Sequence, residues 1–439
     1  MQTESERIRD ELKPRLERAR AATDQLFSWL QPDAWLARPI AERHRLIFEL
    51  GHLEAFDWNL LARDAARRPS RRPHFEQLFA FGIDPLDGTL PADQATDWPS
   101  RDAISAWTRE VRAEVDEVLL SAPLEGYLAR GWAFHLAIEH RELHAETLCH
   151  LLARLPAAHK KVPPAPARPE VAWVSARWCD VPSGTATLGL SRAMHPTLGW
   201  DNEYDEHRVD VPAFRIAAHK VTNAQWLAFI EAGGYREPIH WTAGDAAWRD
   251  SVGLQAPASW KRRDGAWWFQ GVGGESPLDL SAPVYVSHAE ASAYAQWRGA
   301  RLPTEAQWHR AVYGSLQGER AFPWGAAEPK PGVHGNFGGV QFDPTPVGSF
   351  AAGQSAFGLD EPVGNGWEWT GTAFAPFEGF RALPFYRGYS EPFFDGRHFV
   401  MKGGSPRTSV SVLRRTFRNW LQPHDPHAFA TVRLVDAPS

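Results

Sequence analysis

Two histidines four residues apart, His140 and His144, lie in the stretch AIEHRELHAETL (137–148), and a third, His52, lies upstream in ELGHLEAFDWNLL. In a helix, residues i and i+4 project from one face about one turn apart. Each neutral imidazole offers one nitrogen lone pair, so three converging imidazoles would half-fill a coordination sphere and leave positions for water, oxygen or substrate. Three histidines on two helices could therefore converge on one metal ion.

A hydrogen-bonded core is the alternative interpretation of the same three residues. Both helices place their histidines on apolar stripes, and a histidine on such a stripe is commonly a satisfied core residue. The chain has 18 histidines, enough to produce some HxxxH spacings by chance. Zinc and iron are not separated by these ligands, because imidazole suits both metals. The stripe of His140 and His144 contains Ala133, Leu136, Ala137 and Leu148, and that of His52 contains Phe48, Phe56 and Leu60.

The elements that must position these histidines are predicted from periodicity. Helical spacing of Ala, Leu, Arg and Glu predicts a four-helix bundle over residues 1–155. A Pro/Ala-rich linker follows at 156–172, and residues 173–439 form a second domain of short strands and long loops. The predicted bundle helices span about 3–30, 41–65, 100–121 and 128–154, and those of the second domain span 222–234 and 287–299, with a further candidate at 301–314.

Composition excludes several classes of protein. The 439 residues are 43% hydrophobic and carry a net charge of −6, so they can bury a core and show no basic footprint for nucleic acid. Only two cysteines occur, Cys149 and Cys179, which excludes a disulfide framework. No window reaches the roughly 18 apolar residues of a membrane span, and the N-terminus lacks a signal-peptide core. We expect a cytoplasmic protein that contacts neither nucleic acid nor membrane.

Six ordered motifs carry a resemblance to known families. The second half resembles the formylglycine-generating-enzyme-like, C-type-lectin-related fold, and the first half resembles a DinB-like four-helix bundle. In this order, the two resemble the ergothioneine-type sulfoxide synthases and the related selenoneine synthases, and the expected fold class is therefore α+β multidomain. The motifs are WDNEYDEHRVDVPAFRI (200–216), KVTNAQWLAFIEAGGY (220–235), RLPTEAQWHRA (301–311), GNGWEWTGTAFAPFEGF (364–380), KGGSPRTSV (402–410) and RRTFRNWLQP (414–423).

The resemblance implies a non-haem iron(II) enzyme. The metal would be held by His52, His140 and His144 in the first domain, and the reaction would use O2 to join sulfur or selenium to C2 of the imidazole of N-alpha-trimethylhistidine (hercynine). The second domain would bind this substrate. The family's acceptor-binding Asn-Trp pair falls on Asn419 and Trp420 in TFRNWLQP.

Two differences from the family pattern concern the identity of the sulfur or selenium donor. Members that use gamma-glutamylcysteine carry an Asp after the Asn-Trp pair, whereas this chain has Leu421, which cannot accept a bond from a donor amino group. Arg141 replaces the acidic residue that commonly follows the first HxxxH histidine. These differences favour the selenoneine branch, with a selenosugar donor, over a sulfoxide synthase that uses cysteine or gamma-glutamylcysteine.

The catalytic tyrosine of the family has no obvious match. Phe377 occupies the place where many relatives have Tyr, and the candidates are Tyr386 and Tyr389 in PFYRGYSEPFF. Two other classes remain open. A zinc-dependent DinB-like thiol transferase also carries three histidines, and a non-catalytic binding module would consume no oxygen. A formylglycine-generating oxidase is set aside, since that chemistry uses cysteines in the C-terminal part and none follows Cys179.

Overall fold

The computed structural model describes residues 2–80, 92–164, 166–171, 174–192 and 199–436, and these form two compact units. The first unit comprises Met1–Val162 together with His195–Trp200 and Ala382–Tyr389. The second comprises Pro163–Met194, Asp201–Arg381 and Ser390–Ser439. Two short segments of the range predicted as the second domain are thus grouped with the first unit.

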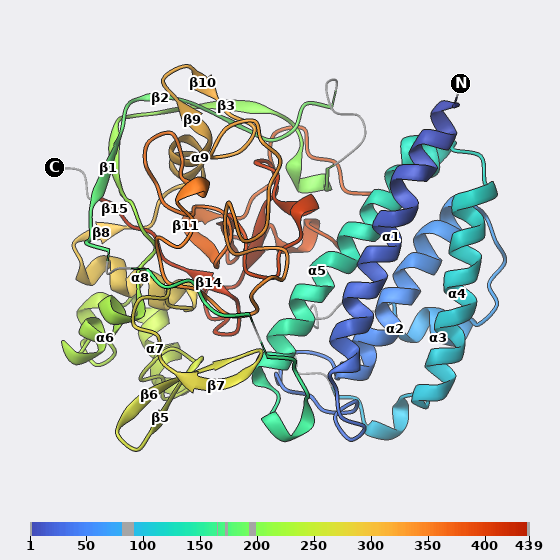
Figure 1. Cartoon of the computed structure of the whole chain (residues 1–439), viewed down its shortest axis with the longest axis horizontal. Helices are drawn as coiled ribbons and strands as arrows, with labels where there is room; N and C mark the ends of the chain where they lie inside the picture. Colours follow the sequence, from blue (N-terminus) through green and yellow to red (C-terminus); the bar gives the residue numbers. More distant parts are fainter. Residues whose placement is uncertain (1, 81–91, 165, 172–173, 193–198, 437–439) are drawn as a thin grey trace. The chain divides into compact units, whose positions relative to one another are not determined.

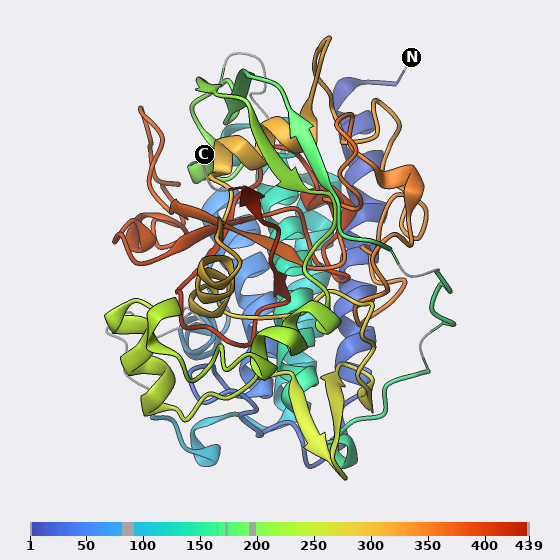
Figure 2. The ribbon, with the colours of Figure 1, turned by 90° about the vertical axis from the view of Figure 1, so that its left-hand side faces the viewer.

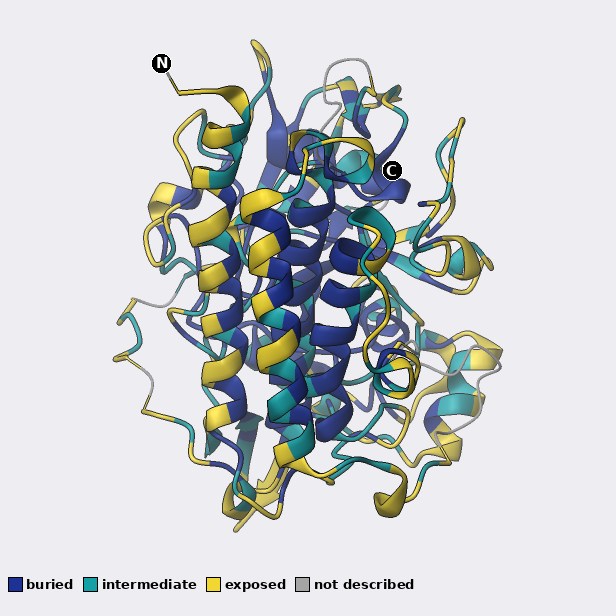
Figure 3. Cartoon of the chain, turned by 90° about the vertical axis from the view of Figure 1, so that its right-hand side faces the viewer, coloured by how far each residue is buried: buried dark blue, intermediate teal, exposed yellow. Residues whose placement is uncertain are grey.

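Long helices build the first unit, and Figure 1 shows α1, α2, α4 and α5 running alongside one another. Figure 3 shows long helices striped yellow outside and dark blue inside, as expected for amphipathic helices around a core. The helices are α1 (Glu4–Ser28), α2 (Leu46–Asp57), the π-helix η1 (Trp58–Ala65), α3 (Pro73–Leu78), α4 (Arg101–Ser121), the 3-10 helix η3 (Gly126–Gly131) and α5 (Trp132–Arg154).

The four predicted bundle helices are present, with two differences. The helix predicted over 41–65 begins at Leu46 and changes to a π-helix at Trp58. The helix predicted over 128–154 begins as an α-helix only at Trp132, because Arg130 and Gly131 have φ values of 54° and 74°. Left-handed residues cannot continue an α-helix, so they fix where α5 starts.

Helix α5 is the central element of the first unit. Six consecutive residues, 136–141, are all buried. Successive residues point about 100° apart around a helix axis, so this run buries every side of α5. The helix contacts both α1 and α2. His140, which lies in this run, is therefore enclosed by protein.

The second unit combines short strands and short helices. Figure 2 shows the antiparallel pair β2–β3 as a long ribbon. Two four-stranded sheets, ordered β1-β4-β15-β8 and β13-β12-β11-β14, provide its framework, and a three-stranded sheet has the order β5-β6-β7. The strands are β1 (Trp178–Val181), β2 (Gly184–Leu188), β3 (His207–Val211), β4 (Phe214–Ala217), β5 (Trp260–Arg263), β6 (Ala266–Gly271), β7 (Gly274–Pro277), β8 (Ala300–Arg301), β9 (Gly314–Ser315), β10 (Gly318–Glu319), β11 (Trp367–Ala373), β12 (Phe399–Lys402), β13 (Asn419–Leu421), β14 (Ala430–Thr431) and β15 (Val435–Asp436).

Helices of the second unit begin at side-chain caps. Thr222, Ser287 and Thr304 each form a capping box with the residue three positions later, which satisfies exposed N–H groups of the first turn. The predicted stretches 222–234, 287–299 and 301–314 contain α6 (Asn223–Glu231), α8 (His288–Trp297) and α9 (Glu305–Tyr313). The prediction missed α7 (Ala243–Ser251). Among the described helices, none combines the length and the apolar character that crossing a membrane requires.

Candidate metal centre

The three predicted histidines come together inside the first unit. His52 projects from α2, and His140 and His144 project from α5. One ligand atom from each lies within 4.8 Å of the others, and all three residues are buried. The ring centroids are 5.2 Å apart for His52 and His140, and 4.4 Å apart for His140 and His144.

Hydrogen bonds orient two of the three rings. His52 Nδ1 lies 2.7 Å from the backbone oxygen of Phe79. A carbonyl only accepts, so Nδ1 carries the proton and Nε2 keeps its lone pair. His144 Nδ1 lies 2.9 Å from Glu49 Oε2, which favours the same tautomer. A Cβ on Gly51 would lie 2.4 Å from the Phe79 ring, so glycine permits this close approach.

His140 has no such partner. Both its ring nitrogens are buried and find no hydrogen-bond partner among the described residues. A buried polar group without a partner costs roughly 1–3 kcal/mol, so an unpaired imidazole in a core requires an explanation. A metal ion would supply the missing interaction. The residues therefore fit a metal that accepts imidazole nitrogens.

The surroundings of the cluster lower the pKa of two of its imidazoles and so favour the neutral form that binds a cation. Burial, with a smaller effect from His144, lowers the pKa of His52 to about 3. Burial and the two neighbouring histidines hold the pKa of His140 well below its usual value. Both rings are therefore neutral at neutral pH, as a ligand must be. Burial acts to raise the pKa of Glu49, but His144 outweighs it and the net pKa is lowered. Glu49 thus supplies a buried negative charge beside the cluster.

Charged side chains connect α2 and α5, the two helices that bear the three histidines. Arg141, which is fully buried, donates to Asp57 Oδ2 at 2.7 Å and to Glu54 Oε1 at 3.1 Å. Arg112 of α4 also donates to Glu54, at 2.8 Å. The departure noted in the sequence at Arg141 is therefore a structural link between α5 and α2.

Aromatic rings cover His140. The Phe56 ring stacks on it with centroids 3.6 Å apart and an interplanar angle of 8°. Tyr386, half-buried in the returning segment 382–389, meets Phe56 edge-on at 5.4 Å and His140 at 6.3 Å. Tyr389 lies beside Tyr386, with centroids 5.7 Å apart. Of the two predicted tyrosines, Tyr386 is the one whose ring contacts a histidine of the cluster.

The predicted substrate residues lie in the second unit, on β13. Trp420 stacks on Phe374 with centroids 4.2 Å apart and an angle of 5°. Asn419 Oδ1 accepts from the backbone N–H of Trp420 at 2.9 Å. Leu421 is half-buried at the end of the strand, opposite Phe399. These three side chains are placed by one short strand.

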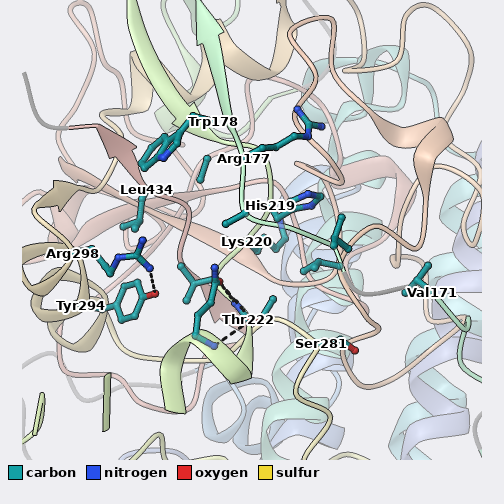
Figure 4. Close-up of a pocket in the computed structure, with 16 residues that line it drawn as sticks. Val171, Arg177, Trp178, His219, Lys220, Thr222, Ser281, Tyr294, Arg298 and Leu434 are labelled. Atoms are coloured by element: carbon teal, nitrogen blue, oxygen red, sulfur yellow. Dashed lines mark hydrogen bonds between the residues drawn. The ribbon is translucent and has the colours of Figure 1, made fainter. Parts of the chain in front are cut away.

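The second unit also has a pocket, shown in Figure 4, with a cavity volume of about 130 Å³. Cationic and aromatic side chains, including Arg177, His219 and Tyr294, line it together with aliphatic residues. No residue of strand β13 belongs to this lining. This pocket is therefore a different place in the second unit from the predicted substrate-binding site on β13.

Sequence reasoning missed two residues near the cluster and one further away. Glu49 and Glu139 are carboxylates inside the apolar runs LIFELGHL and LAIEH, a pattern that marks a buried acid needing a partner. Trp200, which donates to Glu139, gives no local signal, because its partner is 61 positions away.

Phe377 occupies the place where many members of the family have the catalytic tyrosine. Its ring lies in the second unit, with the centroid 4.1 Å from the Arg418 guanidinium.

Comparisons with known proteins agree with this architecture. Residues 15–148 match the DinB superfamily, and residues 172–438 match the sulfatase-modifying factor enzyme 1-like domain. The chain is 36% identical to a hercynine oxygenase of Mycolicibacterium thermoresistibile over 402 residues, which cover 89% of this chain and 86% of the relative. It is 37% identical to that of Mycolicibacterium smegmatis over 420 residues, with coverages of 90% and 93%.

A more distant relative extends the comparison to fungi. Ergothioneine biosynthesis protein 1 of Neurospora crassa is 26% identical over 493 residues, which cover 92% of this chain and 55% of that protein. Fold and matches define a two-part protein in which a DinB-like bundle precedes a sulfatase-modifying-factor-like domain, so the predicted fold class is confirmed. The chain belongs to the hercynine oxygenase family and is an enzyme.

Proposed function

We propose that the enzyme uses O2 to form a bond between a chalcogen and C2 of the imidazole ring of hercynine, with iron(II) held by His52, His140 and His144. For a thiol donor, the thiol, the imidazole C2–H and O2 would give a sulfoxide and water. The two ring nitrogens of His140, buried without partners among the described residues, carry the proposal. The names of the relatives support hercynine as the acceptor.

Iron(II), when bound, would supply O2 activation, which protein side chains alone do not provide. The chain's own contribution is orientation and exclusion of water. Phe79 and Glu49 hold two imidazoles in the tautomer that presents Nε2. The Phe56 ring covers one face of His140. Preorganised groups of this kind place reactants without further loss of entropy during the reaction.

Tyr386 is the proposed proton donor. Its ring meets His140 at 6.3 Å, whereas Tyr389 stacks against Trp200 at 4.0 Å. Replacing Tyr386 with Phe removes the phenolic proton and should lower product formation by roughly a hundredfold or more. Tyr389→Phe, which keeps its ring, should cost much less. Equal losses in the two variants would contradict the assignment.

The chalcogen donor is proposed to be a selenosugar rather than gamma-glutamylcysteine. Leu421 supports this choice, because its side chain offers no acceptor for a donor amino group. Asn419 and Trp420, on the same strand, would contact hercynine. A quaternary ammonium is bound by aromatic faces, and Trp420 provides one.

The test is anaerobic loading with iron(II), followed by O2, hercynine and parallel donors: a selenosugar, cysteine and gamma-glutamylcysteine. Products are identified by mass spectrometry. Selenium incorporation with little sulfur product is expected, and Leu421→Asp should raise the use of gamma-glutamylcysteine. A sulfoxide as the main product of the unaltered enzyme would overturn the selenium assignment. Product formation with zinc but not iron would support a thiol transferase instead.

A further inference from the structure

Two segments from later in the chain, His195–Trp200 and Ala382–Tyr389, belong to the first unit. Trp200, from the first of them, contacts α5, the helix that bears His140 and His144. Its indole N–H donates to Glu139 Oε2 at 2.9 Å, and neither side chain is exposed to solvent. Glu139 immediately precedes His140 on α5. Burying a carboxylate costs several kcal/mol unless its oxygens are hydrogen-bonded, and the Trp200 N–H supplies one such bond to Glu139. The bond therefore fixes Trp200 relative to α5.

Trp200 in turn holds the segment that carries the tyrosines. Its ring stacks on Tyr389 with centroids 4.0 Å apart and an angle of 23°. The backbone N–H of Tyr389 donates to the carbonyl of Tyr386 at 3.1 Å, and the N–H of Tyr386 donates to that of Leu383 at 3.1 Å. One turn thus joins the two tyrosines, and the turn before it joins Tyr386 to Leu383.

These contacts form a closed loop that begins and ends on α5. They begin at Glu139, pass through Trp200, Tyr389 and Tyr386, and end at the ring of His140, the next residue of α5. A closed set of contacts restricts Tyr386 more than a single stacking contact, since each member limits the rotation of the next. Both ends of the set are attached to one helix.

The flanking residues support the same two segments. Within the first unit, Phe385 meets Tyr127 and Trp132 edge-on, at 5.3 and 5.4 Å. Within the second unit, Ser390 donates to Asp201 and accepts from Asn202. Ser390 is therefore joined to Asp201 and Asn202 within the second unit.

We propose that Trp200, anchored by Glu139, is a positioning residue that holds Tyr386 against the histidine cluster through Tyr389. The role of Tyr386 as proton donor rests on the proposed function, whereas the positioning itself is a property of the metal-free protein. Trp200→Phe removes the indole N–H and keeps an aromatic ring. Glu139→Gln keeps an oxygen that can accept from the indole and should retain the arrangement.

The first measurement is 19F NMR of metal-free protein labelled with 3-fluorotyrosine. The chain has eight tyrosines, and the resonance of Tyr386 is assigned by its loss in Tyr386→Phe. Trp200→Phe should shift and broaden this resonance, and Glu139→Gln should leave it close to its original position. Trp226→Phe is the matched control, because Trp226 is equally buried and donates to Tyr235 at 3.1 Å within the second unit. An unchanged Tyr386 resonance in Trp200→Phe would overturn the proposal.

The second measurement compares steady-state kinetics and iron content. Trp200→Phe should lower kcat by roughly ten- to a hundredfold, with KM for hercynine and iron stoichiometry unchanged, because misplacement of a reacting group acts on the chemical step. Loss of iron binding in this variant would instead assign Trp200 a purely structural role. If the unaltered enzyme forms no product with any donor, the proposed function fails, while the NMR result still decides whether Trp200 positions Tyr386.

Discussion

At the scale of single residues, the proposed metal site predicts a role for Glu49, whose carboxylate would tune the affinity of His144 for the metal. Its carboxylate is completely buried and lies 2.9 Å from His144 Nδ1. A carboxylate behind a ligating imidazole orients the ring and raises its basicity, and losing such a partner costs roughly 10- to 100-fold in metal affinity. We expect Glu49→Leu to lose affinity in that range, measured by competition titration with iron(II) under nitrogen.

Glu49→Gln separates orientation from charge. The glutamine oxygen accepts from the same N–H, so this variant should keep more of the affinity than Glu49→Leu. Thermal unfolding of the metal-free variants serves as the control for folding. Wild-type affinity in a folded Glu49→Leu protein would refute the role given to this carboxylate.

Glu361 of the second unit makes stability depend on pH. Burial raises the pKa of its carboxyl from 4.5 to about 8, and Oε1 finds no partner among the described residues. The folded state therefore holds a proton more tightly than the unfolded state, and stability falls as pH rises from 4.5 to 8, by up to about 1.4 kcal/mol per pH unit. Glu361→Gln removes this loss.

The expected result is a difference between the two proteins that grows with pH. Urea unfolding should give Glu361→Gln little advantage near pH 4.5 and a clear gain in unfolding free energy near pH 8. Parallel stability profiles of variant and wild type across this range would mean that Glu361 does not take up a proton on folding.

At the scale of elements, buried ion pairs join α5 and α2, the two helices that bear the three histidines. Arg141 forms an ion pair with Asp57, and Arg141 and Arg112 both form ion pairs with Glu54. Removing one partner of a buried pair costs about 3–5 kcal/mol, because the other charge is left uncompensated. Arg141→Met should therefore lower the free energy of unfolding by about that amount, as measured in urea.

Neutralising the abandoned carboxylate should restore part of this loss. The double variant Arg141→Met with Asp57→Asn is expected to be more stable than Arg141→Met alone, because Glu54 retains Arg112. A double-mutant cycle measures the coupling directly. Additive effects of the two changes would show that the pair contributes no coupling.

Elements were predictable from sequence where periodicity or a cap marks them, and contacts between distant segments were not. The stripe containing Leu136 and Leu148 placed His140 and His144 on a buried face of α5. The π-helix from Trp58 was missed, because its residues continue the helical pattern of α2. The contact of Trp200 with Tyr389 joins residues far apart in the chain, and no local pattern encodes such a pairing.

At the scale of the whole molecule, the chain provides one buried thiol in each unit. Cys149 lies on α5 in the first unit, Cys179 lies on β1 in the second, and no other cysteine exists. A buried thiol reacts with an alkylating reagent only when its surroundings open, so its reaction rate reports the local opening equilibrium. The two cysteines therefore report the stability of each unit separately.

This property tests whether the metal belongs to the first unit. A ligand that binds only the folded form multiplies the closed-to-open ratio by 1 + [L]/Kd, so a metal at 100 times its Kd should slow the alkylation of Cys149 about a hundredfold. Cys179 should react at an unchanged rate, and His140→Ala should abolish the protection of Cys149. The rates are measured under nitrogen with iron(II), using mass spectrometry of the two cysteine peptides. Equal protection of both thiols would show that the two units open together, and protection of Cys179 alone would place the metal outside the histidine cluster.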